Sequence, residues 1–483
     1  MNDRHDLVIV GGGTGGLVAS LIAAGIGARV ALVERDRTGG DCLWTGCVPS
    51  KSLLAAAHLA HRMRHADAVG LTPSYPPVDF AAVMDHVHRA IATIEPHDSP
   101  ARLRAAGVDV IAGDGRFADA RTLEVDGRRL RFRTAIIATG SSPALPPVPG
   151  LAEAPGLLTT DTLWDIGELP ARLVVLGGGP IGCELSQAFQ RLGSAVTTVE
   201  MADRLLLKEE PAASTLIAGR LAAEGIDVRL ASRAVEVRTG DDGSPELTIE
   251  TPEGARTVPF DRILVAAGRR PRTDDLGLTE AGIETDGGGA VIVDPRLRTS
   301  APGIYAVGDV TGLLPFTHVA AHHARVATVN ALFHARGKTE TAATIPWVTF
   351  TDPEVARVGL TEAQARENWG ERAVVASVGY DAVDRAITEG ETHGFAKLIG
   401  DRRGRLVGAT VAAPGAGEVI GELAARVARG DKVGAVSTAV HAYPTLAEGP
   451  ARAADAFLRE RYAKPRYRAA AKPVLAGLRL LRR

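Results

Sequence analysis

Leu7-Val-Ile-Val-Gly11-Gly-Gly13-Thr-Gly-Gly16 is the stretch of sequence that decides the fold of this chain. Its apolar run predicts a buried strand over residues 7–10, and its Gly-x-Gly-x-x-Gly turn predicts a helix that continues to about residue 24. A second apolar run over residues 29–33 ends at Glu34. In such a unit the first glycine permits a tight turn, the second lets a pyrophosphate approach the backbone, and the third lets the helix pack on the strand. The stretch therefore predicts a dinucleotide-binding α/β domain.

The same pattern occurs a second time, as Leu173-Val-Val-Leu-Gly177-Gly-Gly179-Pro-Ile-Gly182, followed by an expected helix to residue 192 and a strand over residues 195–199. Glu200 ends that strand 23 positions after Gly177, as Glu34 lies 23 positions after Gly11. The N-terminus of each helix presents unpaired N–H groups to an anion. Each terminal carboxylate can accept hydrogen bonds from an adenosine ribose. Two such units at one internal spacing predict two dinucleotide sites.

Two of the three cysteines follow the first site, in Gly-Gly-Asp-Cys42-Leu-Trp-Thr-Gly-Cys47-Val-Pro-Ser-Lys51. A paired dithiol can take two electrons from a hydride carrier and pass them on by thiol chemistry. A zinc site needs more ligands than two cysteines, and no Cys-x-x-Cys pair occurs, so we expect no metal site. The pair is therefore interpreted as a redox-active disulfide. The lone Cys183 is interpreted as small core filler.

The cysteines follow the first glycine turn, so that site is assigned to bound FAD and the second site to a visiting nicotinamide. Glu200 would repel a 2′-phosphate, and no arginine follows it immediately, which favours NADH over NADPH. Arg204 lies close enough in sequence to leave NADPH open.

Length and composition restrict the class of protein. A chain of 483 residues suggests roughly three domains, and its 45% hydrophobic content is ample for large buried cores. The net charge of −2 gives no electrostatic argument for nucleic-acid binding. No stretch approaches the ~20 apolar residues of a membrane helix. Three cysteines in a long chain fit a reducing cytosol, so we expect a cytoplasmic location.

Four further segments complete a resemblance to the pyridine nucleotide–disulfide oxidoreductases, which covers about residues 5–460. They are Ala138-Thr139-Gly140, Gly268-Arg269-Arg270-Pro271, Gly303-Ile-Tyr-Ala-Val-Gly308-Asp309, and the run from Phe350 to Gly359. The resemblance implies an α/β fold with two Rossmann-type dinucleotide-binding domains, for FAD and NAD, and a C-terminal α+β dimerisation domain. It also implies a homodimer with shared active sites.

The same resemblance implies the domain boundaries. The FAD-binding domain is split into residues 1–148 and 269–343, with the NAD(P)H-binding domain, residues 149–268, between its halves. Residues 344–465 are the expected dimerisation domain, and residues 466–483 form a basic C-terminal tail.

In the family, the thiol that matches Cys47 lies nearer the flavin and the one that matches Cys42 attacks the substrate. Lys51 matches a lysine near the flavin, and Glu184 matches its ion-pair partner beside the nicotinamide. The residues expected to contact FAD are Gly11, Gly13, Gly16, Glu34, Thr139, Gly140, Gly308 and Asp309. Those expected to contact the nicotinamide dinucleotide are Gly177, Gly179, Gly182, Glu200 and Gly268.

The chain departs from the family at His441-Ala-Tyr443-Pro-Thr-Leu-Ala-Glu448. The disulfide reductases and dihydrolipoamide dehydrogenases have a catalytic histidine where this chain has Tyr443, whereas Glu448 is retained. A tyrosine donates a hydrogen bond but is a poor base near pH 7. His441 lies two positions earlier and could face the same side of a strand. Tyrosine at this position resembles mercuric reductases and soluble transhydrogenases, but the latter lack the second cysteine.

The leading hypothesis is an NADH-dependent FAD enzyme that passes electrons through Cys42 and Cys47 to a metal ion, a quinone or another small electrophile. It resembles a mercuric reductase without that group's C-terminal delivery cysteines. The first alternative is a dihydrolipoamide dehydrogenase-like enzyme that acts on dithiols or disulfides. The second is a slow-turnover redox sensor or scaffold that binds FAD.

Three weaker patterns remain. His58, His61 and His65 would share one face of a helix that starts near Lys51, as a metal-handling face or a solvated one. His318, His322 and His323 are interpreted as packing or flavin-pocket residues. The tail carries basic residues, no acid, and a stripe at Leu475, Leu478 and Leu481. Membrane attachment of this tail stays open beside a frayed or surface-docked helix.

Overall fold

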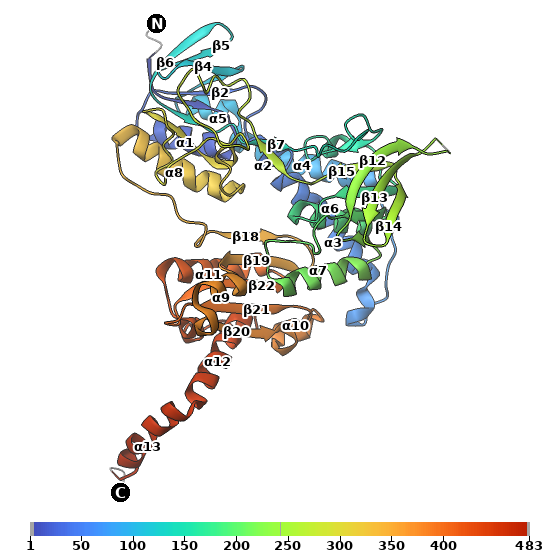
Figure 1. Ribbon diagram of the computed structural model, residues 1–483, viewed down its shortest axis with the longest axis vertical. Helices are drawn as coiled ribbons and strands as arrows, with labels where there is room; N and C mark the ends of the chain where they lie inside the picture. The colour runs from blue at the N-terminus through green and yellow to red at the C-terminus, as the bar shows by residue number, and fades with distance from the viewer. Residues whose placement is uncertain (1–3, 242, 481–483) are drawn as a thin grey trace. The chain divides into compact units, whose positions relative to one another are not determined.

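The first glycine turn follows β1 (Arg4–Val10), an inner strand of a seven-stranded sheet, of which Figure 1 labels β2, β4, β5 and β6. The computed structural model describes residues 4–241 and 243–480. Six strands run in the order β3-β2-β1-β6-β5-β4, and β17 pairs with β6. β1 pairs in parallel with β2 and β6, which places Leu7 opposite Val30 and Thr134. Residues 7–10 are buried because helices and further chain cover both faces of a parallel sheet.

The elements of this sheet come from two separate parts of the chain. The first part contains β1, α1 (Thr14–Gly25), β2 (Val30–Glu34), α2 (Gly40–Trp44), α3 (Cys47–Arg64), η1 (Ala66–Val69), α4 (Phe80–Asp98), α5 (Pro100–Ala105), β3 (Val108–Ala112), β4 (Gly115–Asp119), β5 (Thr122–Val125) and β6 (Arg128–Ile137). The second part contains β17 (Ile304–Ala306), η3 (Gly308–Thr311) and α8 (Thr317–Phe333). The sheet is therefore completed by a strand that returns about 165 residues after β6.

A second parallel sheet is formed by the chain between those two parts. Its order is β11-β10-β9-β15-β8, and the second glycine turn follows β9. Its elements and the adjoining strands are β7 (Ser141–Pro143), β8 (Leu157–Leu158), η2 (Leu163–Asp165), β9 (Arg172–Leu176), α6 (Pro180–Leu192), β10 (Ala195–Val199), α7 (Pro211–Ala223), β11 (Asp227–Arg229), β12 (Arg233–Thr239), β13 (Pro245–Thr251), β14 (Gly254–Pro259), β15 (Arg262–Val265) and β16 (Arg269–Pro271). Strands β12, β13 and β14 form an antiparallel sheet, and β16 pairs with β7 where the chain leaves and re-enters this region.

The C-terminal part is an antiparallel sheet with helices. The strand order is β18-β19-β22-β21-β20, and α11 and α12 pack on its buried face. The elements are β18 (Pro346–Thr349), β19 (Glu354–Gly359), α9 (Glu362–Trp369), η4 (Gly370–Arg372), β20 (Val374–Gly379), η5 (Tyr380–Ala382), α10 (Asp384–Glu389), β21 (Phe395–Gly400), β22 (Leu406–Ala413), α11 (Ala416–Arg429), η6 (Val433–Thr438), α12 (Glu448–Ala463) and α13 (Pro465–Leu480). None of the helices within residues 4–241 and 243–480 combines the length and the apolar character that crossing a bilayer requires.

The chain divides into two compact units. The first contains the residues up to Met63, Tyr75–Asp203 and Glu224–Thr339, and so holds both parallel sheets. The second contains Arg64–Ser74, Arg204–Ala223 and the chain from Glu340 onward. The segments 64–74 and 204–223 therefore group with the second compact unit, and they fall within the ranges that the family resemblance assigns to the two nucleotide domains.

Buried charges explain why the segment 204–223 belongs to the second unit. Glu209 forms an ion pair with Arg357 at 2.8 Å and accepts a hydrogen bond from the Trp347 indole at 2.6 Å. Glu210 forms an ion pair with Lys397 at 2.9 Å. Both glutamates are at most 5% exposed. Charged residues are almost never fully buried unless they are paired, so a hydrophobic pattern predicts glutamates to be exposed. The pattern therefore does not predict these buried contacts.

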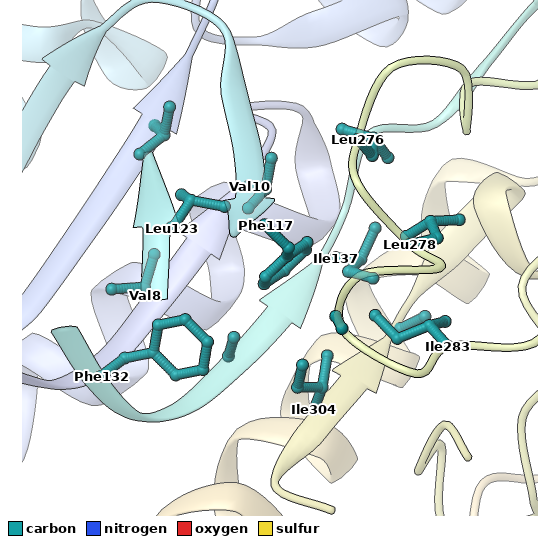
Figure 2. Packing of buried hydrophobic residues seen from close by; sticks show 14 of the residues in the cluster. Val8, Val10, Phe117, Leu123, Phe132, Ile137, Leu276, Leu278, Ile283 and Ile304 are labelled. Atoms are coloured by element: carbon teal, nitrogen blue, oxygen red, sulfur yellow. The ribbon is translucent and has the colours of Figure 1, made fainter. Parts of the chain in front are cut away.

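The core of the first sheet is an apolar cluster on one of its faces. Figure 2 shows Phe117 and Phe132 beside Leu123 and Ile137, and the cluster includes Ile304 from the returning chain. The two phenylalanine rings pack edge to face, with centroids 6.0 Å apart. This cluster joins the two sequence-distant parts of the domain.

Leu123→Ala is expected to lower the free energy of unfolding by about 2–5 kcal/mol, because Leu123 is fully buried in that cluster and its truncation leaves a cavity. Leu145→Ala, the same substitution at a side chain that is 45% exposed, should change it by no more than about 0.5 kcal/mol. Guanidinium unfolding of both variants measures the difference, and equal losses would show that this cluster does not support the fold.

Candidate active site

The first and third glycines of the first turn have no room for a side chain. Gly11 has φ +104°, and a Cβ there would lie 2.4 Å from the Ala138 carbonyl oxygen. A Cβ on Gly16 would lie 1.9 Å from the Gly11 carbonyl oxygen. Helix α1 begins after Gly13 without a side-chain cap and without an acidic residue in its first turn. Its first N–H groups are thus left for an anion, which fits the pyrophosphate of a dinucleotide.

The second turn repeats these features. Gly177 has φ +114°, and a Cβ on Gly182 would lie 1.8 Å from the Gly177 carbonyl oxygen. Helix α6 begins after Gly179, again without a side-chain cap. The residues of both turns therefore fit the group that the sequence predicts for them.

The two terminal glutamates hold the turns in the same way. Glu34 accepts hydrogen bonds from the backbone N–H groups of Gly12 at 2.5 Å and Asp36 at 2.9 Å. Glu200 accepts them from Gly178 at 2.6 Å and Ala202 at 2.7 Å. Each carboxylate is thereby fixed at the end of its strand, next to the glycine turn.

The two cysteines lie on consecutive helices and are free thiols in this structure. Cys42 is in α2, Cys47 is the first residue of α3, and the Cys47 Sγ lies 3.3 Å from the Thr317 hydroxyl at the start of α8. A hydrogen bond from Cys42 lowers the pKa of Cys47 to about 6, helped by Thr317 and Lys51 and opposed by burial. The same contact with Cys47, together with burial, raises the pKa of Cys42. The pair is therefore asymmetric, with the thiolate at Cys47 and the proton at Cys42.

Three tethers hold the chain around these thiols. The Trp44 indole donates to the Thr38 carbonyl at 2.8 Å, and the buried Trp164 indole donates to the Thr45 carbonyl at 2.9 Å. Asp41 forms an ion pair with Arg272 at 3.1 Å and another with Arg269. No local pattern in the sequence indicates this role of Trp164, because Trp164 lies 119 residues from Thr45. The turn between the cysteines is thus fixed from both sides.

Lys51 and Glu184 are brought together. The Lys51 ammonium lies 2.7 Å from Glu184 Oε2, which joins α3 to the N-terminal half of α6. The Glu184 side chain is 7% exposed and that of Lys51 is 37% exposed. Next to Glu184, Cys183 is fully buried, and burial raises its pKa.

The expected flavin contacts from the later segments lie at the ends of β6 and β17. Asp309 accepts a hydrogen bond from the Ser141 hydroxyl at 2.7 Å and lies 3.8 Å from Arg269, and burial raises its pKa. The Thr139 hydroxyl donates to the Arg272 carbonyl at 2.7 Å. Gly140, Gly268 and Gly308 have φ of +73°, +148° and +73°, a conformation that favours glycine. Ser141, Arg269 and Arg272 therefore join the predicted residues in one polar cluster.

Tyr443, Glu448 and His441 belong to the second unit, whereas the cysteines belong to the first. Tyr443 is 70% exposed, and its hydroxyl donates to Asp384 at 2.9 Å, which raises the Tyr443 pKa. The His441 ring is 2.9 Å from Glu422. Tyr443 and His441 thus face different carboxylates. Glu448 lies 3.6 Å from Arg452, and its buried Oε2 has no hydrogen-bond partner among the described residues.

The histidine patterns have different outcomes. Helix α3 ends at Arg64, so His65 lies beyond it and the expected three-histidine helix face is wrong. Within the described ranges, 4–241 and 243–480, no three or more His, Cys, Asp or Glu side chains are grouped so that together they could hold a metal ion. His323 is buried, its Nδ1 lies 3.4 Å from the Gly308 N–H, and burial lowers its pKa to about 4. His318 stacks on Phe316.

Known proteins resemble this chain in sequence and in fold. The family described as pyridine nucleotide-disulphide oxidoreductase matches residues 5–324, and its dimerisation domain matches residues 345–454. A mercuric reductase from Streptomyces lividans is 38% identical over 460 residues, which cover 94% of this chain and 96% of the relative. A dihydrolipoyl dehydrogenase from Bacillus subtilis (strain 168) is 35% identical over 456 residues, or 93% and 96% of the two chains.

A solved structure adds a third comparison. The Cu(II) complex of the HOCl-induced flavoprotein disulfide reductase RclA from Escherichia coli has a TM-score of 0.82 and 28% sequence identity, over 94% of this chain and 100% of that chain. The predicted α/β fold with FAD- and NAD-binding domains and a C-terminal dimerisation domain is confirmed.

Thr317→Val is expected to raise the pKa of Cys47 by roughly one to two units, because a hydrogen bond to a charged group is worth about 1.5–3 kcal/mol. The pKa of Cys47 is lowered from 9.0 to about 6, so the stability gained from its thiolate is present above pH 9 and is lost as the pH falls through 6. The pH dependence of Cys47 alkylation in the reduced protein measures this pKa. Thr93→Val, which removes an exposed hydroxyl on α4, is the control. An unchanged profile in Thr317→Val would show that the hydroxyl does not stabilise the thiolate.

Proposed function

Because the chain belongs to the pyridine nucleotide-disulphide oxidoreductases, we propose that it passes electrons from NADH, through FAD and the Cys42–Cys47 pair, to a metal ion, a quinone or another small electrophile. The observation that carries the proposal is the asymmetric thiol pair, in which Cys47 is the thiolate and Cys42 holds the proton. Flavin and pyridine nucleotide use is typical of this family.

FAD, when bound, supplies the acceptor for a hydride and the donor of two electrons to the disulfide. The turn at Gly11, Gly13 and Gly16 would hold its pyrophosphate, and Glu34 its adenosine ribose. The part of FAD that leads to the flavin ring would be lined by Thr139, Gly140, Gly308 and Asp309. Lys51 would place a cation beside the ring, and Glu184 balances that charge because a lone buried charge is costly.

The different pKa values of the two thiols account for the protons of the proposed reaction. Two electrons cleave the disulfide into two thiolates, and one proton returns to Cys42, whose pKa is raised. Cys47 stays ionised at neutral pH because its pKa is about 6. Cys42 is then the thiol that meets the acceptor, and it releases its proton when its sulfur binds an electrophile or a metal ion.

Tyr443 supports an acceptor that needs no base. Its raised pKa keeps the hydroxyl protonated near neutral pH, so it can donate a hydrogen bond but cannot collect a proton. A disulfide substrate leaves a thiolate that must be protonated, and His441, which the structure pairs with Glu422, is not directed to the same carboxylate as Tyr443. A quinone or a metal ion depends less on that proton cycle.

The relatives support two different classes of electron acceptor, a metal ion and a disulfide. A mercuric reductase and the Cu(II) complex of RclA favour a metal ion as substrate. The dihydrolipoyl dehydrogenase at 35% identity favours the second candidate, a dithiol–disulfide oxidoreductase. Activity with lipoamide distinguishes these two candidates. Slow NADH oxidation with every acceptor tested would favour the redox sensor or scaffold.

Two copies of the chain would share each active site. The match of residues 345–454 to a dimerisation domain supports a homodimer. In that dimer, Tyr443 and Glu448 of one subunit would reach the cysteines of the other, as the family resemblance implies. A fully active monomer in light scattering would contradict this arrangement.

NADH is expected to be the preferred donor, since Glu200 suits a ribose hydroxyl and repels a 2′-phosphate. Arg204 is the cation nearest in sequence that could bind a 2′-phosphate. Its guanidinium instead donates to the carbonyls of Leu207 at 2.7 Å and Glu209 at 3.1 Å, which supports the preference for NADH. The ratio of kcat/KM for NADH and NADPH should fall by roughly tenfold or more in Glu200→Gln. The exposed Asp203→Asn, which removes one negative charge three residues later, should leave the ratio nearly unchanged. A wild-type preference for NADPH would overturn the donor assignment.

Wild type is expected to reduce a quinone or Hg²⁺ measurably and lipoamide poorly. Tyr443→His should raise lipoamide turnover by ~10²-fold or more, because general acid–base help is typically worth ~10²–10⁴-fold. Tyr443→Phe keeps the ring and removes the hydroxyl, so it should not gain that activity. The assay is steady-state NADH oxidation with each acceptor. If wild type already reduces lipoamide efficiently and His441→Ala abolishes this, His441 is the base and the interpretation of Tyr443 is wrong.

A further inference from the structure

Helix α13 (Pro465–Leu480) exposes its apolar side chains. Val474 is 62% exposed, Leu475 50%, Leu478 54% and Leu480 73%. Apart from Tyr467 at its start, every residue of α13 whose side chain is described is exposed. Tyr467 packs edge to face on Tyr462 of α12, which fixes the start of the helix. Most of the helix has no covering surface in this chain.

The residues of α13 sort into two adjoining faces. At 3.6 residues per turn, Ala471, Val474, Leu475 and Leu478 lie along one side of the helix. Arg468, Lys472 and Arg479 lie along the neighbouring side, whereas Leu480 lies on the far side. We call the first set the apolar stripe and the second set the basic stripe.

The charge of this segment is of one sign. Residues 464–483 contain seven lysines and arginines and no acid, so the rest of a chain with net charge −2 carries −9. A partner of α13 must therefore be anionic and must also accept the apolar stripe. Duplex nucleic acid meets only the first requirement, and a second copy of α13 would bring like charges together.

We propose that α13 docks the protein on an anionic lipid surface, with the apolar stripe at the acyl boundary and the basic stripe among the head groups. A helix with leucines on one side and basic residues beside them is the form that lies in a membrane interface. Anionic head groups attract the basic stripe, and the acyl boundary removes the apolar stripe from water.

The helix itself benefits from such a surface. Pro473 has no backbone N–H to donate to the preceding turn, and Gly477 is a poor helix former. An unpacked helix of 16 residues is marginal in water, so a surface that covers its apolar stripe adds stability that α13 does not gain from this chain.

The test is sedimentation of the full-length, flavin-loaded protein with vesicles of phosphatidylcholine, alone or mixed with phosphatidylglycerol. Binding is expected only with the anionic vesicles and should weaken at high salt. Leu478→Asn should reduce binding at least roughly tenfold, and Arg468→Gln should reduce it roughly fivefold. Leu480→Asn, the same substitution on the far side, is the matched control and should bind as wild type. NADH oxidation should be unchanged in all three variants.

Several results would overturn the proposal. Equal binding to neutral and anionic vesicles, or none to either, removes the lipid partner. Equal losses in Leu478→Asn and Leu480→Asn show that the apolar stripe is not the contact. Binding to duplex DNA that is as tight as to anionic vesicles and is insensitive to Leu478→Asn shows a general polyanion site. A change of oligomeric state in Leu478→Asn assigns the stripe to contact between copies.

Discussion

The ion pair between Lys51 and Glu184 joins the helix that begins with Cys47 to the helix that follows the second glycine turn. Lys51 is one turn along the first of these helices, and Glu184 lies just beyond the first turn of the second. Their 2.7 Å contact therefore positions the thiol relative to the place where a nicotinamide dinucleotide would bind. Glu184 is buried whereas the Lys51 side chain is 37% exposed, so solvent screens the pair in part, and loss of Lys51 would leave the Glu184 carboxylate buried without this cation. The Trp164 and Asp41 tethers hold the cysteine turn from its other side.

Local patterns in the sequence predicted the parts of the site that depend on local geometry. The glycines are required where a Cβ would collide with backbone, as at Gly11 and Gly16, and the glutamates follow at a fixed distance because one strand–helix–strand unit sets it. The contact of Thr317 with Cys47 joins residues 270 positions apart, and that of Arg269 with Asp41 joins residues 228 apart. No periodicity encodes such contacts, since only the packed fold brings them together.

Two features of the structure differ from what the sequence pattern suggests, and both have physical causes. The three-histidine face is not formed because α3 ends at Arg64, one residue before the last imidazole, and helix ends are the least certain feature of a pattern. The segment 204–223 groups with the second compact unit because Glu209 and Glu210 are paired with Arg357 and Lys397 in its interior. Charged residues normally indicate surface, so buried pairs mislead a reading based on polarity.

In the proposed function, Cys47 is the ionised thiol beside the flavin and Cys42 is the outer thiol. Anaerobic titration of the purified protein with NADH, followed by the long-wavelength absorption of a thiolate next to oxidised flavin, distinguishes the two thiols. We expect this band to appear in wild type after two electrons, to be present without reduction in Cys42→Ser, and to be absent in Cys47→Ser. A band that survives in Cys47→Ser, or that requires Cys42, would show that these roles are wrongly assigned.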